Sequence, residues 1–427
     1  MSKKNAYLLA LALAGCALAL AVISASAQDW PQWRGPNRDG RATGFNVPKI
    51  WPKNLTQIWK VVVGDGVATP SLVGDKLYVF ARMDGSETIR CLDVATGKEL
   101  WKDKYDALPA VGSASGFPGP RCSPTVSNGR VITLGVRGVL SCLDARDGKL
   151  IWRKDDFKGA TPRFYTSSSP LVTDGLCIAE MGGGTNGGVV AYDLTNGNQK
   201  WKWTGDIPAY SSPMLMTVGG MRLVVTLTEA KVVALTLADG KQVWETPFPV
   251  PGRGYNVATP IVDGQTLIYT GVARGVTAVK LEKKGDGIEA SELWKSAPLS
   301  VMFNTPVLKN GLLFGITEGN EFFCISAKDG KTAWTSPITP DANASAESEG
   351  GLRGRRRGGY GTIVDVGSVL LGLTPTSELI AFEPTDKAYT EVARIKVADT
   401  PTYTSPVPSG DRVFVKDQDS VMLWAIQ

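Results

Sequence analysis

Short apolar runs recur from residue 57 to the C-terminus, and turn-forming residues separate them. Five stretches repeat one nine-residue pattern that ends in tryptophan: DVATGKELW from 93, DARDGKLIW from 144, DLTNGNQKW from 193, TLADGKQVW from 236 and SAKDGKTAW from 326. The polar residues favour a tight turn, and the glycine can take the positive φ that closes it. The pattern therefore predicts a β-hairpin whose second strand carries the tryptophan.

A second signature, serine or threonine followed by proline, lies upstream of these hairpins. It occurs at Thr69-Pro70, Ser123-Pro124, Ser169-Pro170, Ser212-Pro213, Thr259-Pro260, Thr305-Pro306 and Ser405-Pro406. Apolar residues follow each proline, and most copies then carry another turn signal, such as Asn128-Gly129. Each unit therefore predicts four antiparallel strands joined as a meander.

The spacing of the prolines predicts how many units the chain contains. Most successive prolines lie 43 to 54 residues apart, but Pro306 and Pro406 are separated by 100. We expect a degenerate seventh unit in this gap, with strands near residues 361–367 and 379–382.

The last unit has only three strands of its own. They are expected at residues 406–407, 413–416 and 421–426. Residues 57–61 supply the fourth, because Trp59 lies 42 positions before Trp101, which is one repeat. Units of this size and period form β-propellers. The sequence thus predicts an all-β, eight-bladed propeller of four-stranded antiparallel blades, closed by N- and C-terminal strands that share the last blade.

One tryptophan per unit is expected to wedge between neighbouring blades, because a single sheet cannot bury both of its faces. These residues are Trp59, Trp101, Trp152, Trp201, Trp244, Trp294 and Trp334. Cysteine or alanine recurs a few positions before the turn, at Cys91, Cys142, Cys324, Ala191 and Ala234. A position that accepts only these residues indicates a small buried slot, with a redox role for the cysteines as the alternative.

The repeated phrases and the Ser/Thr-Pro starts resemble the PQQ-like β-propeller repeats of the quinoprotein alcohol dehydrogenase-like superfamily. The same repeats occur in the propeller lipoprotein of the outer-membrane β-barrel assembly machinery. The segment DWPQWRG at 29–35 is similar to the arm that precedes ring closure in these propellers. The resemblance covers nearly all of the chain after residue 27 and is far more specific for the fold than for an activity.

The dehydrogenase branch of this resemblance implies PQQ on the propeller axis beside Ca²⁺, an aspartate base, and a disulfide between neighbouring cysteines over the quinone. No two cysteines are adjacent here, and no set of Glu, Asn and Asp at the blade starts offers an oxygen cage for Ca²⁺. We therefore expect no cofactor, no metal and no catalysis. A PQQ-dependent dehydrogenase with calcium remains the alternative.

Residues 1–27 have the pattern of a signal peptide, with Lys3 and Lys4, an apolar stretch and the small residues Ala25-Ser26-Ala27. Export to the periplasm or cell envelope follows, with residues 28–56 as an arm and 57–427 as the propeller. Cys16 also lies in a lipobox-like context, so lipidation at Cys16 is the alternative to a mature chain that begins at Gln28. No later run is long enough to span a bilayer.

Composition excludes several functional classes. The chain has no histidine, which excludes Ser-His-Asp and Cys-His centres and histidine-ligated metals. A net charge of +5 over 427 residues is too balanced for a nucleic-acid-binding surface.

The connections between blades should gather at one mouth of the central channel, as a funnel. The candidate funnel residues just before the Ser/Thr-Pro marks are Arg121, Arg163, Tyr165, Tyr210, Arg253, Tyr255, Asn256, Phe303, Asn304, Tyr360 and Tyr403. Arginine and tyrosine are favoured at binding surfaces. The set predicts a funnel for an envelope protein, an extended peptide or a polysaccharide, and the alternative is that each residue packs between loops.

Residues 341–361 are rich in glycine and arginine and have no apolar periodicity. They predict a flexible insertion that is either a solvated loop or a contact for anionic lipid or polysaccharide. The leading interpretation of the whole chain is an exported, monomeric, non-catalytic propeller scaffold that binds a protein or polymer partner. A quinoprotein oxidoreductase and a carbohydrate-binding propeller are the alternatives.

Overall fold

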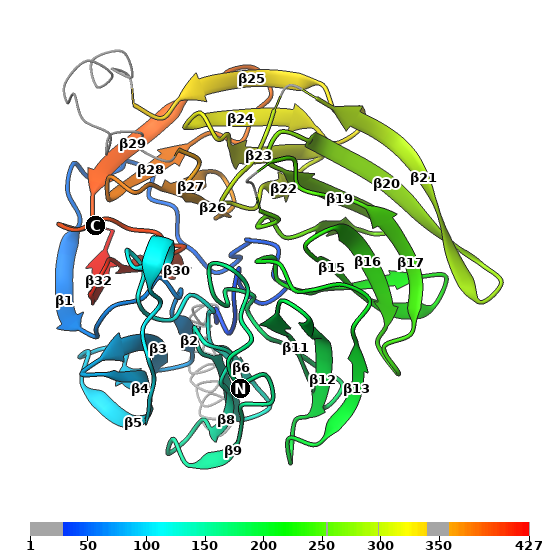
Figure 1. Cartoon of the computed structure of the whole chain (residues 1–427). Helices are drawn as coiled ribbons and strands as arrows, with labels where there is room; N and C mark the ends of the chain where they lie inside the picture. The colour runs from blue at the N-terminus through cyan, green and yellow to red at the C-terminus, as the bar shows by residue number, and fades with distance from the viewer. Residues whose placement is uncertain (1–28, 253–254, 298, 340–357, 427) are drawn as a thin grey trace, which may run out of the picture.

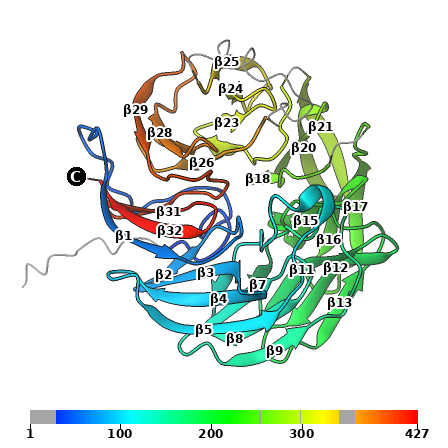
Figure 2. The same ribbon diagram turned by 60° about the vertical axis from the view of Figure 1, so that its left-hand side comes forward.

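The computed structural model describes residues 29–252, 255–297, 299–339 and 358–426. In this part of the chain, eight four-stranded antiparallel sheets form a ring (Figures 1 and 2), which confirms the predicted eight-bladed propeller. The predicted signal peptide with Cys16, the candidate Arg253 and most of the Arg/Gly-rich insertion lie outside the described residues. No described helix is both long and apolar enough to cross a bilayer.

The four strands of a blade are called A to D, and the C–D turn joins the last two. In each of the first four blades these strands have the same order in the chain and in the sheet. Blade 1 consists of β2 (Ser71–Val73), β3 (Lys76–Met83), β4 (Ser86–Asp93) and β5 (Glu99–Asp106). Blade 2 consists of β6 (Thr125–Ser127), β7 (Arg130–Leu134), β8 (Leu140–Asp144) and β9 (Leu150–Lys154). Blade 3 consists of β10 (Leu171–Thr173), β11 (Leu176–Gly183), β12 (Asn186–Asp193) and β13 (Gln199–Trp203). Blade 4 consists of β14 (Met214–Val218), β15 (Met221–Leu227), β16 (Lys231–Thr236) and β17 (Gln242–Pro247).

The next three blades have the same order, and a short 3₁₀ helix, η1 (Gly112–Ala114), lies between blades 1 and 2. Blade 5 consists of β18 (Ile261–Asp263), β19 (Thr266–Gly271), β20 (Gly275–Lys284) and β21 (Gly287–Ser296). Blade 6 consists of β22 (Val307–Lys309), β23 (Leu312–Ile316), β24 (Glu321–Ser326) and β25 (Thr332–Pro337). Blade 7 consists of β26 (Thr362–Asp365), β27 (Leu370–Leu373), β28 (Glu378–Phe382) and β29 (Glu391–Lys396), as the degenerate unit predicted.

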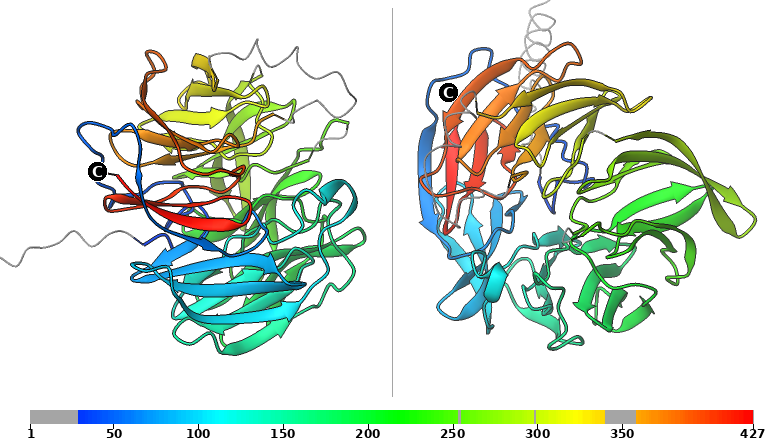
Figure 3. Two further views of the ribbon diagram at one scale, coloured as in Figure 1. Left: turned by 90° about the vertical axis from the view of Figure 1, so that its left-hand side faces the viewer. Right: turned by 45° about the horizontal axis from the view of Figure 1, so that its top comes forward.

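Blade 8 is made from both ends of the described chain. Its strands are β30 (Val407–Ser409), β31 (Arg412–Lys416), β32 (Ser420–Ala425) and β1 (Thr56–Val62). In its sheet β1 pairs antiparallel with β32, so the N-terminal strand is the outermost strand of the last blade. Figure 3 shows this closure as the blue strand beside the red ones. The predicted ring closure is therefore confirmed.

At six of the eight junctions a tryptophan docks its blade onto the C–D turn of the next blade. Six indole N–H groups donate to a carbonyl in the following blade: Trp59 to Val94 (2.9 Å), Trp101 to Ala145 (3.3 Å), Trp152 to Leu194 (3.0 Å), Trp201 to Leu237 (3.0 Å), Trp294 to Ala327 (2.8 Å) and Trp334 to Thr385 (2.8 Å). At five junctions the indole also lies against the turn glycine, and a Cβ on Gly240 would stand 2.5 Å from Trp201. Burying an aromatic of this size contributes ~4–6 kcal/mol before entropy.

The small slot predicted at the cysteines lies directly across the strand pair from the tryptophan. Cys91 is opposite Trp101, and the cysteine or alanine of four further blades holds the same position. The register of all eight C–D pairs shifts immediately before this tryptophan position. Such bulges twist an outer strand and discourage pairing with another chain, and they leave residues such as Leu100 and Leu293 exposed.

Blade 5 departs from the pattern because it lacks the nine-residue phrase. Its β20 and β21 are ten residues each and join through a turn at Lys284–Gly287. Leu281 and Ile288 on this long hairpin join the hydrophobic cluster of blade 4, which also contains Trp244. The tryptophan of blade 4 therefore packs on the side of a hairpin rather than on a glycine turn.

The arm connects the two sides of the ring. Trp30 forms backbone hydrogen bonds with Leu72 of blade 1. The N–H of Ala42 donates to the carbonyl of Asp365 in blade 7, and the N–H of Asn46 donates to the carbonyl of Gly410 in blade 8. Trp30 is fully buried in the hydrophobic cluster of blades 1, 7 and 8. The arm thus ties together the blades that meet at the closure.

A buried lysine reinforces this closure. Lys416 at the end of β31 has no exposed surface, and its Nζ lies 2.6 Å from the Gly66 carbonyl and 3.3 Å from that of Gly64. Carbonyls of Asp417 and Gln418 lie at 3.1 and 3.3 Å. Burial lowers the pKa of Lys416 to about 8. The ammonium group therefore connects blade 8 to the segment that leads into blade 1.

We predict that Gly240→Ala destabilises the protein more than Gly220→Ala. Both glycines have positive φ, 71° and 81°, so the backbone strain of the two substitutions is similar. A Cβ at position 240 would collide with Trp201, whereas a Cβ at position 220 meets nothing within 4 Å. Overpacking costs about 1–3 kcal/mol, so the urea midpoint should fall further for Gly240→Ala. Equal midpoints would contradict the indole–turn contact as a source of stability.

Candidate functional site

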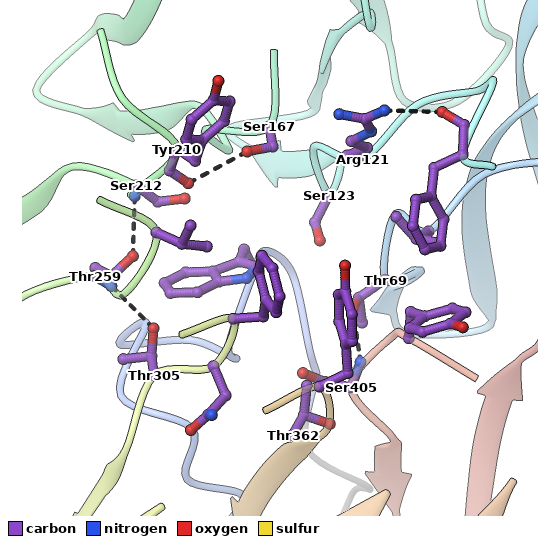
Figure 4. Close-up of a pocket in the computed structure, with 18 of the residues that line it drawn as sticks. Thr69, Arg121, Ser123, Ser167, Tyr210, Ser212, Thr259, Thr305, Thr362 and Ser405 are labelled. Atoms are coloured by element: carbon purple, nitrogen blue, oxygen red, sulfur yellow. Dashed lines mark hydrogen bonds between the residues drawn. The ribbon is translucent and has the colours of Figure 1, made fainter. Parts of the chain in front are cut away.

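All eight blades contribute to one cavity of about 250 Å³ on the propeller axis. A hydroxyl side chain from each blade lines it: Thr69, Ser123, Ser167, Ser212, Thr259, Thr305, Thr362 and Ser405. Figure 4 shows these residues around the cavity. Six of them belong to Ser/Thr-Pro marks just before the A strands, and Ser167 and Thr362 supply the hydroxyl in blades 3 and 7.

The hydroxyls of the Ser/Thr-Pro marks also connect the blades to one another. The hydroxyl oxygen of one blade accepts the backbone N–H at the same position of a neighbouring blade, in five pairs: Ser123 to Ser169 (3.0 Å), Ser169 to Ser212 (2.9 Å), Ser212 to Thr259 (2.9 Å), Thr259 to Thr305 (3.0 Å) and Ser405 to Thr69 (3.0 Å). These bonds use a lone pair on each oxygen and leave its proton available. The hydroxyl ring thus joins the blades and can still donate to a ligand.

The arm contributes Trp33 to the lining of the cavity. Guanidinium groups flank the indole, with Arg34 at 5.5 Å and Arg38 at 5.6 Å from the ring centre. Arg34 donates to the carbonyls of Thr305 (2.6 Å) and Pro306 (2.8 Å). Trp33 is therefore held by groups anchored in the ring.

Arg38 makes the matching contacts on the other side. It donates to the carbonyls of Ser169 and Pro170, both at 2.9 Å. Burial lowers the pKa of Arg34 to about 10 and that of Arg38 to about 9, so both stay charged at neutral pH.

Aromatic residues surround the mouth in two groups. The first contains Phe117, Phe303, Tyr360 and Tyr403, and the second contains Phe164, Tyr210 and Tyr255. Ring centres are 4.1 Å apart in the stacked pair of Phe303 and Tyr360, and 4.5 Å apart in the edge-on pair of Phe164 and Tyr255. The rings support one another and are half-buried, which leaves one face of the set for a ligand.

Arg121 bridges the two aromatic groups. Its guanidinium donates to the carbonyl of Phe164 in one group and to that of Phe117, at 2.9 Å, in the other. Its Nε and the Ser123 hydroxyl are buried and have no hydrogen-bond partner among the described residues. Burial lowers the pKa of Arg121. Unsatisfied buried polar groups are rare in folded proteins, so these two indicate a place for a polar ligand.

The cavity is positive. Two arginines, Arg34 and Arg121, line it, and none of its lining side chains is acidic. A guanidinium is always protonated under ordinary conditions, so the lining favours an anion and disfavours a cation.

The cavity brings together most of the predicted funnel residues that the structure describes. Arg121, Tyr210, Tyr255, Phe303, Asn304, Tyr360 and Tyr403 line it. Three others lie elsewhere. Asn256 is buried and donates to the carbonyls of Thr228 and Phe248, Tyr165 packs beneath Arg137, and Arg163 is exposed beside Phe164.

Other lining residues were not among the sequence candidates. Trp33 and Arg34 come from the arm, and Phe117 and Phe164 come from the loops between blades. The hydroxyl ring had a signal in the sequence, since the Ser/Thr before proline recurs in seven units, but only the strand start was inferred from it. No local pattern places the arm at the axis, because that position depends on the closed ring.

The structure also bears on the cofactor that the dehydrogenase resemblance implies. The lining has no carboxylate, and among the described residues no three His, Cys, Asp or Glu side chains are grouped to hold a metal ion. The cysteines at 91, 122, 142, 177 and 324 are all buried and unpaired, and burial raises the pKa of each thiol. The described residues therefore do not fit PQQ with Ca²⁺ and a vicinal disulfide.

A family model described as outer membrane protein assembly factor BamB matches residues 85–336. The chain belongs to this family. BamB of Burkholderia pseudomallei is 27% identical over 243 residues, which cover 55% of this chain and 55% of that protein. BamB of Yersinia pestis is 24% identical over 323 residues, which cover 70% and 75% of the two chains.

Dehydrogenases with the same repeats are similar as well. The quinohemoprotein alcohol dehydrogenase of Comamonas testosteroni is 28% identical over 193 residues, which cover 42% of this chain and only 26% of that enzyme. Its crystal structure superposes with a TM-score of 0.62 at 14% identity, over 95% of this chain and 82% of that one. BamB of Moraxella catarrhalis superposes with a TM-score of 0.61 at 13% identity, over 87% and 99%. These structures establish the shared fold and no more.

A buried carboxyl group lies near the arm. Glu180 of β11 is 1% exposed, accepts a hydrogen bond from the Thr226 hydroxyl through Oε1, and has no described partner at Oε2. Burial raises its pKa to about 8, although the hydrogen bonds and the charge of Arg38 oppose this rise. The folded protein therefore holds a proton on Glu180 between about pH 4.5 and pH 8, where the unfolded chain does not.

We predict that the wild type loses stability relative to Glu180→Gln as the pH rises through this window. A raised folded-state pKa contributes stability that is complete below pH 4.5 and is lost as the pH passes about 8. The slope for one proton is up to about 1.4 kcal/mol per pH unit. Urea unfolding of both proteins at several pH values measures this difference. A pH-independent difference would show that Glu180 is not protonated in the folded state.

Proposed function

We propose that the protein is an exported, non-catalytic propeller that binds a partner protein in the cell envelope through the funnel. The cavity carries this proposal, because it presents aromatic rings, two arginines and hydroxyl groups and has no acidic lining residue. Tyrosine, tryptophan and arginine dominate the energetics of protein interfaces. A set of this kind, reached by the loops of all eight blades, favours binding over proton transfer.

The family supports the same proposal. The family is named for an outer membrane protein assembly factor, and several relatives carry that name. An assembly factor of this kind works in the envelope, which agrees with the signal peptide predicted at residues 1–27. Whether the chain is anchored through Cys16 or released at Gln28 does not change which face carries the funnel.

A quinoprotein dehydrogenase is the second candidate, and the similarity to quinohemoprotein alcohol dehydrogenases favours it. The sequence match covers 26% of the Comamonas enzyme, and the acid-free lining speaks against a calcium-bound quinone. Titration of the purified protein with PQQ, with and without Ca²⁺, should give no saturable binding, and dye-linked assays with alcohols and sugars should show no turnover. Saturable binding of PQQ together with turnover would contradict the scaffold proposal and establish the dehydrogenase function.

Photocrosslinking tests the scaffold proposal directly. A benzoylphenylalanine at position 117 places the probe in the mouth, and the same probe at position 293 lies on the outer edge of blade 5. We expect the probe at 117 to form adducts in cells with a component of outer-membrane protein assembly, identified by mass spectrometry, and the probe at 293 to form none with it. Adducts from position 293 alone would place the interface outside the funnel.

A further inference from the structure

The shape of the cavity limits how a partner can enter it. Trp33, flanked by Arg34 and Arg38, is part of the lining of this cavity of about 250 Å³. A concave site on the axis suits the end of a chain or a protruding side chain better than a flat surface.

The charge of the lining selects between the two ends of a polypeptide. An N-terminal ammonium would face Arg121 and Arg34 with no acidic lining side chain to accept its protons. A C-terminal carboxylate would meet these guanidinium groups in a partly desolvated space, where such attraction is strong. The lining therefore favours the C-terminus.

The unsatisfied groups of the cavity match a carboxylate. The Ser123 hydroxyl is 1% exposed and has no described partner, and neither has Nε of Arg121. The hydroxyls of Ser212, Thr259 and Thr305 already accept backbone N–H groups, so their protons can point to an acceptor. A carboxylate has two oxygens with several acceptor sites and can use donors from more than one blade.

The aromatic groups match the side chain that precedes this carboxylate. Phe303 and Tyr360 stand on one side of the mouth, and Phe164 and Tyr255 on the other. An aromatic ring that enters the cavity can make edge-on or offset contacts with rings of either group. The loop that contributes Ser113 and Ala114 to the lining also carries Leu108 and Val111, which are 68% and 54% exposed and available to the residues before the last one.

We infer that the cavity receives the C-terminal residue of a partner polypeptide, with its free carboxylate at Ser123 and Arg121 and an aromatic side chain between the two aromatic groups. This inference rests on the proposed function, because it names the part of the partner that enters the funnel. Among the described residues, neither the cavity beside the A strands of blades 4 and 5 nor the one between the arm and blades 6 and 7 is lined by a buried donor without a partner.

Calorimetry with defined peptides tests the inference on the whole mature protein. The probe is the hexapeptide Gly-Ser-Val-Ser-Val-Phe with a free carboxylate, compared with its C-terminal amide and with the same peptide ending in alanine. A hydrogen bond to a charged group is worth about 1.5–3 kcal/mol, so the amide should bind about tenfold to a hundredfold more weakly. The alanine peptide should also bind more weakly. Equal affinity of acid and amide would overturn the inference.

Two serine substitutions test whether the preference for the peptide acid arises in the cavity. Ser123→Ala removes a hydroxyl that lines the cavity, whereas Ser168→Ala removes a hydroxyl that is equally buried and unpartnered but does not line it. We expect Ser123→Ala to reduce the difference in affinity between the peptide acid and the peptide amide, and Ser168→Ala to leave this difference unchanged. Since neither hydroxyl has a described partner, both variants should fold. An unchanged difference in Ser123→Ala would also overturn the inference.

Two further outcomes separate the sources of the carboxylate and the two proposals. N-acetylphenylalanine should bind more weakly than the hexapeptide, and equal affinity would mean a site for a small aromatic acid rather than for a chain end. If acid and amide bind alike while position 117 still crosslinks to its partner, only this inference fails. If crosslinking fails as well, the proposed function fails with it.

Discussion

The contact between an indole and the glycine turn of the next blade is the interaction on which the ring depends. It needs a tryptophan on the outer strand, a glycine without Cβ, a carbonyl that accepts the indole N–H, and a small residue across the strand pair. These needs account for the glycine and the tryptophan of the repeated nine-residue phrase and for the small residue two positions before it. Where the phrase is missing, in blade 5, a longer hairpin covers the neighbouring tryptophan instead. Packing between blades, rather than strand propensity, thus explains the repeat.

Closure of the ring creates the site as a by-product of the same repetition. Six Ser/Thr-Pro starts, together with Ser167 and Thr362, place one hydroxyl per blade at the axis, and bonds from N–H to hydroxyl connect neighbouring blades there. The arm adds Trp33 to the lining, between two arginines that bind carbonyls on different parts of the ring. Because these arginines have carbonyl rather than carboxylate partners, their positive charge is not neutralised. The cavity is therefore positive for reasons that begin with the architecture.

The same fold occurs in proteins named as assembly factors and in quinohemoprotein dehydrogenases, so the fold does not decide between binding and redox chemistry. The decision lies in the side chains at the axis. An acid-free lining with aromatic rings and free hydroxyl donors suits recognition of an anionic group, and buried, separated thiols with raised pKa are poor nucleophiles and redox partners. These are the features on which the proposed function rests.

The sequence alone determined the number of blades, the strand order and the shared last blade, because each is written in local turn chemistry and in the spacing of Trp59, Trp101 and the Ser/Thr-Pro marks. It also indicated Arg121 and the tyrosines as axial, since they precede those marks. Only the tertiary structure placed Trp33 and Arg34 at the axis, buried Lys416 among carbonyls, and turned Asn256 away from the cavity. The reason is physical: hairpin geometry depends on neighbours in sequence, whereas Arg34 and Lys416 depend on partners hundreds of residues away that only the closed ring brings together, and Asn256 depends on carbonyls of the preceding blade.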